Sequence, residues 1–159
     1  MGIEKEIGQV HFRSDHQKAI INMVYTYNWM MEKMKRRLDE FDLTLQQFNI
    51  LRILRGANGP LSTLQIRERM LDKMSDTSRI VDRLILKDLA RKNTCCRDKR
   101  LVDVLITAKG LKLLAELDRH ADELDAIIGN ISSDEAKQLN LLLDKVRNPV
   151  SLAKETAAV

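Results

Sequence analysis

Cysteine, proline and histidine are scarce in this chain of 159 residues, which has two cysteines, two prolines and three histidines. Cys95 and Cys96 are adjacent, so they cannot join distant parts of the fold. We therefore expect stability to come from packing and not from disulfide bonds. The histidines are His11, His16 and His120. Their positions show no metal-ligand spacing with the cysteines, so the sequence predicts no metal site.

Long apolar runs are also missing from the sequence. None approaches the roughly 20 residues that a membrane helix needs. The first ten residues, MGIEKEIGQV, include acidic side chains and no apolar core, unlike a signal peptide. We therefore expect a cytoplasmic protein with no membrane attachment. The hydrophobic content of 44% and charged content of 31% favour one folded domain over residues 1–159.

Motifs of catalysis are absent as well. The sequence has no Gly-rich phosphate loop, no nucleophile elbow and no paired cysteine and histidine. These absences rank an enzyme last among the possible classes, and we expect no cofactor.

Positive charge is present in excess and is concentrated in one stretch. The chain has a net charge of +4, which favours an anionic partner. Between Lys73 and Arg100 there are nine basic and four acidic residues, a net charge of +5. Between Thr107 and Arg147 there are six basic and eight acidic residues, a net charge of −2. Basic and acidic regions are therefore segregated along the chain.

A helix with one apolar and one polar face is predicted at the start of the basic stretch. Its apolar residues recur at i, i+3, i+4 and i+7. These are Thr77, Ile80, Val81 and Leu84. The opposite face is polar and rich in hydrogen-bond donors, with Ser75, Asp76, Arg79, Asp82 and Arg83.

A basic hairpin is predicted directly after this helix. Residues 101–106 are apolar and partly β-branched apart from Asp103, which favours a half-buried strand, and residues 89–94 would be its partner. The tip between them is Cys95, Cys96, Arg97, Asp98, Lys99 and Arg100. A polar-faced helix followed by a basic hairpin suits duplex DNA, because the major groove admits a helix and phosphates attract Lys and Arg.

The sequence RIVDRLILKDLARK, followed by RDKRLVDVLITAKG, resembles the winged helix-turn-helix core of the multiple antibiotic resistance regulator (MarR) family. The matching residues are Asp98 and Arg100 at the wing tip, then Ile106, Thr107 and Gly110. The resemblance implies a mainly α fold with a small β-wing. It places a winged helix-turn-helix DNA-binding core at residues 43–107, between long dimerisation helices at residues 14–42 and 107–147.

Periodicity and helix caps agree with this arrangement. Apolar residues from Ile20 to Phe41 recur in steps of three and four, which predicts one long helix that is too long for a small core to cover. A second long helix is predicted from Thr107 through Ile128, and residues 1–14 show no period. Capping boxes predict three further helix starts, at Thr44 with Gln47, Ser62 with Gln65, and Ser132 with Glu135.

The resemblance implies a sequence-specific transcriptional regulator. It would bind a pseudo-palindromic operator as a homodimer, with recognition helices roughly 34 to 36 Å apart, and a ligand would release it as a repressor. The alternative is a winged-helix protein-interaction module that has lost DNA binding. Asp98, Arg100 and the basic stretch argue against that alternative.

The expected DNA contacts lie in three places: the groove face of the helix, the wing tip, and the start of the helix at Ser62 and Thr63, where the helix dipole would hold a phosphate. The groove face of the helix would contribute side chains that read bases or hold phosphates, whereas the competing interpretation is a solvated charged face. Arg100 would enter the minor groove, with Asp98 either orienting it or simply forming a turn. The full set is Ser62, Thr63, Ser75, Asp76, Ser78, Arg79, Arg83, Arg97, Asp98, Lys99 and Arg100.

Two residues depart from the family pattern. Asp88 stands where a glycine commonly follows the recognition helix, in a cap that Asp adopts less easily. Asp76 is an acid on the groove face, where it would repel phosphate but accept a hydrogen bond from a cytosine amine.

The resemblance also implies a small aromatic or anionic effector, held between the terminal helices and the core. Aromatic residues and a histidine occupy the matching region, although core or interface packing is the favoured interpretation. They are Phe12, His16, Tyr25, Tyr27 and Trp29. Basic neighbours of Cys95 and Cys96 would favour a reactive thiolate. Ordinary wing residues are the preferred interpretation, because redox-sensing relatives carry their cysteine near the first helix.

Overall fold

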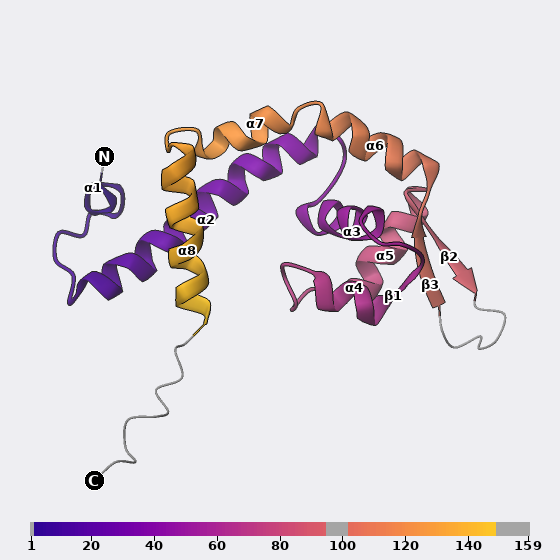
Figure 1. Cartoon of the computed structure of the whole chain (residues 1–159), viewed down its shortest axis with the longest axis horizontal. Coiled ribbons are helices and arrows are strands. Elements are labelled where there is room, and N and C mark those ends of the chain that lie inside the picture. The colour runs from indigo at the N-terminus through magenta and orange to yellow at the C-terminus, as the bar shows by residue number, and fades with distance from the viewer. Residues whose placement is uncertain (1, 95–101, 149–159) are drawn as a thin grey trace, which may run out of the picture. The chain divides into compact units, whose positions relative to one another are not determined.

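A computed structural model describes residues 2–94 and 102–148, and the chain divides into two compact units, Met1–Ala121 and Asp122–Val159 (Figure 1). The first unit contains α1 (Ile3–Ile7), α2 (Asp15–Asp39), α3 (Leu45–Arg55), β1 (Leu61–Ser62), α4 (Thr63–Arg69), α5 (Thr77–Leu86), β2 (Ala90–Thr94), β3 (Val102–Ile106) and α6 (Ala108–Asp118). Next come α7 (Ala121–Asp125), which begins at the last residue of the first unit, the 3-10 helix η1 (Ala126–Ile128) and α8 (Ser133–Arg147).

The sheet of the first unit is small and antiparallel, with strand order β1-β3-β2. In the β2–β3 hairpin, Ala90 pairs with Ile106 and Thr94 pairs with Val102. This hairpin confirms the two strands predicted from the sequence. Strand β1, in which Leu61 pairs with Val104, was not predicted, because two residues are too few to show an alternating pattern.

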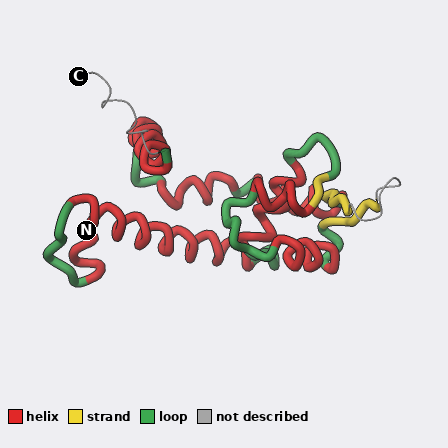
Figure 2. Tube along the Cα trace, turned by 90° about the horizontal axis from the view of Figure 1, so that it is seen from below, coloured by secondary structure: helices red, strands yellow, loops and turns green. Residues whose placement is uncertain are grey.

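Helices α3 to α6 and the sheet enclose one hydrophobic core, and we call this part of the first unit the head. Figure 2 shows the strands of the sheet, in yellow, among helices. Helix α3 is central to it, since it contacts α4, α5, α6 and β3. The predicted apolar stripe of α5 faces this core, with Thr77, Val81 and Leu84 buried. The largest fully buried side chains are Leu38, Ile50, Leu51, Ile66, Leu84, Leu114, Val81 and Val104.

The three predicted capping boxes are all present. At α3, the Thr44 hydroxyl accepts a hydrogen bond from the Gln47 amide (3.2 Å), and the Gln47 side-chain oxygen accepts one from the Thr44 amide (3.1 Å). The same reciprocal pair starts α4 and α8. Each box satisfies two amides that the helix itself leaves without partners.

The junction between β3 and α6 explains the Thr-x-x-Gly pattern of the sequence. The Thr107 hydroxyl donates to the carbonyl of Asp88 (2.7 Å) and accepts from the Gly110 amide (3.1 Å). A Cβ atom on Gly110 would lie 2.4 Å from the Leu89 carbonyl oxygen, so no larger residue fits without a shift. Asp88, directly after the C-cap of α5, adopts the left-handed conformation (φ 59°) that was expected for this position.

One short helix was not predicted, and two predictions about helices were wrong. Residues 3–7 form α1, which is too short for periodicity to reveal. Helix α2 ends at Asp39, so Phe41 lies in the following turn. The predicted continuous helix from Thr107 to Ile128 is interrupted after Asp118. There the Arg119 and His120 amides donate to carbonyls three residues back, which tightens and ends α6 without any proline or glycine.

The long helices bury little apolar surface within the described chain. Leu38 is the one buried residue that α2 contributes over its 25 residues, and α8 contributes none. Within the described residues, no helix combines the length and apolar character needed to cross a membrane.

Candidate nucleic-acid interface

The outward face of α5 is polar and accessible. Ser78, Arg79, Asp82 and Arg83 are all exposed, opposite the buried stripe. The Arg79 side chain is 83% exposed. This helix therefore presents two guanidinium groups on a face that packing leaves open.

The turn before α5 corrects the position predicted for Ser75. Ser75 lies before the helix, where its hydroxyl donates to Asp72 Oδ2 (2.5 Å). The Met74 amide donates to Asp72 Oδ1 (3.0 Å). The Ser75 hydroxyl, and next the Met74 amide, hold the pKa of Asp72 below its ordinary value. The Ser75 hydroxyl proton is thus directed toward the protein, and the turn is ordered by a charged acceptor.

Asp76 also lies outside the helix face on which it was predicted. It is the N-cap of α5, where its Oδ1 accepts from the Arg79 amide (3.2 Å). Its Oδ2 lies 3.3 Å from Arg79 Nε. An aspartate is a favoured N-cap because its oxygen satisfies a free amide of the first turn.

Lys92 of β2 joins the hairpin to α5. Its ammonium group lies 2.8 Å from Asp82 Oδ1, and both side chains are about half exposed. Asp76, the N-cap of α5, and Asp82, on its outward face, are therefore each paired with a cation. This pairing reduces the repulsion that the two carboxylates would exert on a phosphate backbone.

A shallow hollow of about 430 Å³ lies beside the first turn of α5. Its lining includes Thr63, Leu64 and Arg67 of α4, together with Met74. Met74 is 93% exposed and Leu64 is 62% exposed. Leu64, Arg67 and Met74 were not among the DNA contacts predicted from the sequence, although the spacing of the two helices in a helix-turn-helix could have indicated them.

The remaining predicted DNA contacts divide into two groups. Ser62 caps α4 and Thr63 begins it, and both are partly exposed. Ser62 and Gln65 already use their amides within the capping box. The wing-tip residues lie outside the described part of the chain. These are Cys95, Cys96, Arg97, Asp98, Lys99 and Arg100.

The predicted effector residues lie on α2 and on the segment before it. Tyr25 donates from its hydroxyl to Glu6 of α1 (3.0 Å), and this hydrogen bond raises the pKa of Tyr25. The Phe12 ring lies 5.8 Å from the ammonium group of Lys18. His16, Tyr27 and Trp29 are exposed.

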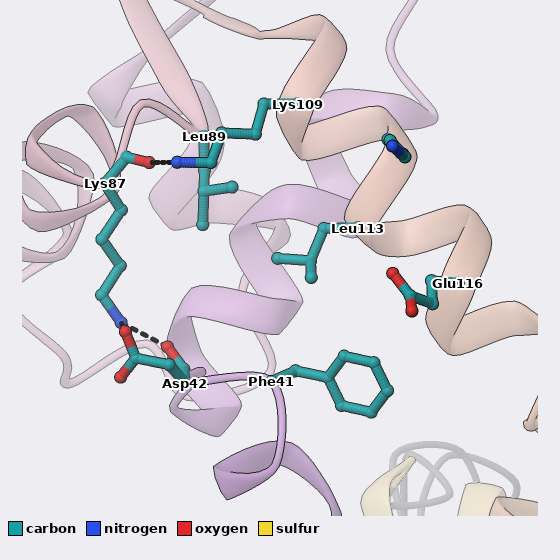
Figure 3. A pocket seen from close by; sticks show the side chains of 8 residues that line it. Phe41, Asp42, Lys87, Leu89, Lys109, Leu113 and Glu116 are labelled. Carbon is teal, nitrogen blue, oxygen red and sulfur yellow. Dashed lines mark hydrogen bonds and ion pairs between the residues drawn. The ribbon is translucent and has the colours of Figure 1, made fainter.

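A second hollow, of about 340 Å³, lies where the α2–α3 turn, the end of α5 and α6 meet (Figure 3). Lys87 reaches across to Asp42, with 3.0 Å between its Nζ and Asp42 Oδ2. Lys109 donates to the carbonyl oxygen of Lys87 (2.8 Å). Phe41, Leu89, Lys112, Leu113 and Glu116 complete the lining. The hollow thus combines three lysine side chains and two carboxylates with apolar side chains.

Helix-turn-helix geometry and the β2–β3 hairpin together define a winged helix-turn-helix protein, and known proteins agree. MhqR, an HTH-type transcriptional regulator of Bacillus subtilis, is 27% identical over 131 residues, which span 81% of this chain and 89% of MhqR. The crystal structure of a MarR transcription factor from Planctomyces limnophilus is 31% identical with a TM-score of 0.66, covering 84% of this chain and 98% of that one. No family model matches the chain.

A further solved structure, of a mutant E. coli MarR complexed with operator DNA, shares the fold. It has a TM-score of 0.72 and 23% identity, covering 82% of this chain and 92% of that one. The chain belongs to the MarR family of transcription regulators, since the likeness to the Planctomyces limnophilus factor reaches 31% identity over almost that whole protein. This result confirms the family that the wing pattern indicated.

Proposed function

We propose that this protein binds duplex DNA sequence-specifically through α5 and the wing, and represses transcription as a homodimer until a small effector releases it. The observation that carries the proposal is the open face of α5, which presents Arg79 and Arg83 beside the basic hairpin. A protein with this action on chromosomal DNA would work in the cytoplasm. Residues 43–107 would be the DNA-binding core.

The homodimer is proposed from the apolar side chains that the long helices leave exposed. On α2, Ile20 is 59% and Val24 56% exposed. On α8, Leu141 is 71% and Val146 66% exposed. Exposed apolar faces of this kind mark protein-protein contacts, and a second copy of the chain would cover them. The dimerisation region would comprise residues 14–42 and 107–147.

Selection from a random-sequence duplex library, followed by fluorescence-anisotropy binding across a salt series, tests DNA recognition. We expect an enriched pseudo-palindrome whose affinity falls steeply with salt, because Lys and Arg release counterions from phosphates. Arg83→Ala and Arg100→Ala should each weaken specific binding, by about 1 to 3 kcal/mol if the arginine contacts a base.

Lys137→Ala is the matched control, since it removes one exposed positive charge from α8. It should change specific affinity little. If no sequence is enriched and all variants bind alike, the protein is instead an interaction module, and partner capture should replace DNA selection.

For the effector we propose a small aromatic carboxylate, because the hollow at Lys87 places ammonium groups beside Phe41, Leu89 and Leu113 (Figure 3). The region of Phe12, His16, Tyr25, Tyr27 and Trp29 remains the other proposed location. Benzoate titrated into the protein–DNA complex is a simple probe. Loss of the response in Lys112→Ala would locate the effector in the hollow, whereas loss in Trp29→Ala would locate it on α2.

A further inference from the structure

We propose that Asp76 is a positioning residue that holds the Arg79 guanidinium by its Nε edge, so that the terminal amino groups of Arg79 read a guanine in the major groove. The inference rests on the proposed DNA binding. It replaces the role that the sequence suggested for Asp76, which was direct contact with a cytosine amine.

The geometry engages both carboxylate oxygens of Asp76 with one residue. Oδ1 accepts from the Arg79 backbone amide at 3.2 Å, and Oδ2 lies 3.3 Å from Arg79 Nε. The first contact is the N-cap of α5, so the start of the helix itself sets the direction of the carboxylate. The second contact then determines which edge of the guanidinium faces the protein.

A guanidinium carries five N–H donors in one plane. When the Nε donor faces Asp76, the donors on the two terminal nitrogens remain. Their parallel N–H groups match O6 and N7 of guanine, which is the commonest specific contact of arginine with a base. Orienting the side chain before binding also reduces the conformational entropy that it would lose on the DNA.

The position of Arg79 along the helix suits this role. It is the third residue of α5, and the N-terminal residues of a recognition helix are those that contact base edges. At 83% exposure, its side chain is free of the hydrophobic core. Thr77, two residues earlier, is buried and anchors the same turn through a hydrogen bond from its hydroxyl to the Met70 sulfur (3.4 Å). The reading side chain thus projects from an anchored turn.

The cytosine alternative is weaker on the same geometry. Oδ1 of Asp76 already accepts from the Arg79 amide, and Oδ2 lies in an ion pair with Arg79 Nε, so a cytosine amine would have to compete with both contacts. A carboxylate in the groove without a cation beside it would also approach phosphates unfavourably.

The test compares base preference in wild type, Arg79→Ala and Asp76→Asn, using selection from random duplexes and anisotropy on single-base variants of the selected site. Arg79→Ala should abolish a guanine preference at one position of each half-site. Asp76→Asn should weaken the preference at that same position by roughly two- to fivefold, the range of an exposed ion pair. The double variant should resemble Arg79→Ala alone.

The controls separate positioning from folding and from charge. Asn caps helices as well as Asp does, so the unfolding midpoint of Asp76→Asn should match wild type. Asp82→Asn removes the same charge from the same helix and should leave the guanine preference intact. The inference is overturned if Asp76→Asn changes preference at a different position from Arg79→Ala, or leaves every preference unchanged. If wild type selects no motif, the proposed function itself fails.

Discussion

The head and the long helices α2 and α8 contain the same kinds of apolar residue, but these residues are buried in the head and exposed on the long helices. In the head, Leu84 and Leu114 have no exposed surface, and Leu117 has 2%. On the long helices, Ile20 remains 59% and Leu142 61% exposed. The head therefore closes a core within one chain, whereas the long helices leave apolar side chains exposed, as surfaces of protein–protein contact do.

Local signals do not distinguish the two regions. A capping box begins α3 in the head, and another begins α8, which has no buried residue. Both helices are thus specified locally by the same device. The difference lies in what surrounds them, since α3 contacts α2, α4, α5 and α6, whereas α8 leaves several large apolar side chains exposed.

The largest expected effect comes from a matched pair of leucine truncations. Leu84→Ala in the head should lower the free energy of unfolding by about 2 to 5 kcal/mol, because it leaves a cavity in a closed core. Leu142→Ala on α8 should change it by less than about 0.5 kcal/mol at protein concentrations where the chain is monomeric. Urea denaturation followed by circular dichroism measures both.

Sedimentation equilibrium measures how the same two variants affect dimer formation. Leu142→Ala should raise the dimer dissociation constant, and Leu84→Ala should affect it only through unfolding. Equal losses of unfolding free energy in the two variants would mean that Leu142 is buried in the monomer, which would contradict the exposure of α8.

A glycine pair gives the next effect in size. Gly110→Ala should cost about 1 to 3 kcal/mol, because its Cβ would lie 2.4 Å from the Leu89 carbonyl oxygen and 2.8 Å from Ile106 Cγ1. Gly59→Ala, where nothing lies within 4 Å, is the control and should be close to neutral. Thermal unfolding by calorimetry compares them. Similar melting temperatures for the two variants would show that the β3–α6 junction accommodates a Cβ atom at residue 110 without loss of stability.

The smallest effect is a difference in pH response between the capping boxes. The amide of Ser132, and next its hydroxyl, hold the pKa of Glu135 below its ordinary value. The stabilisation is therefore present above the ordinary carboxyl pKa and is lost as the pH falls through the lowered one. The boxes of α3 and α4 use Gln47 and Gln65, which do not titrate.

Amide chemical shifts measured by NMR from pH 7 to pH 3 would show this difference. The chemical shift of the Ser132 amide should change as the first turn of α8 frays, and that of the Gln47 amide should not. Glu135→Gln should remove the response of α8. A shift of both amides over the same pH range would indicate acid unfolding of the whole chain and not the loss of one cap.

Most local structure was predictable because the relevant interactions span only a few residues. Capping boxes join residues three apart, and the stripe of α5 depends on one helical period. The interruption of α6 after Asp118 was not predictable, since the sequence there has neither proline nor glycine. Strand β1 was also missed, because its two residues become a strand only through pairing with β3.

In the interface, the polar face of α5, the basic hairpin and the family could be predicted from the sequence alone, because these depend on residue type and spacing. Tertiary structure decided the roles of individual side chains. The Ser75 hydroxyl donates a hydrogen bond to Asp72, and ion pairs join Asp76 to Arg79 and Lys92 to Asp82. These contacts depend on where the backbone turns. Tertiary structure also decided that Gly110 is required, because only the folded chain brings the Leu89 carbonyl against α6. Spacing specifies which residues share a face, whereas packing specifies what each of them touches.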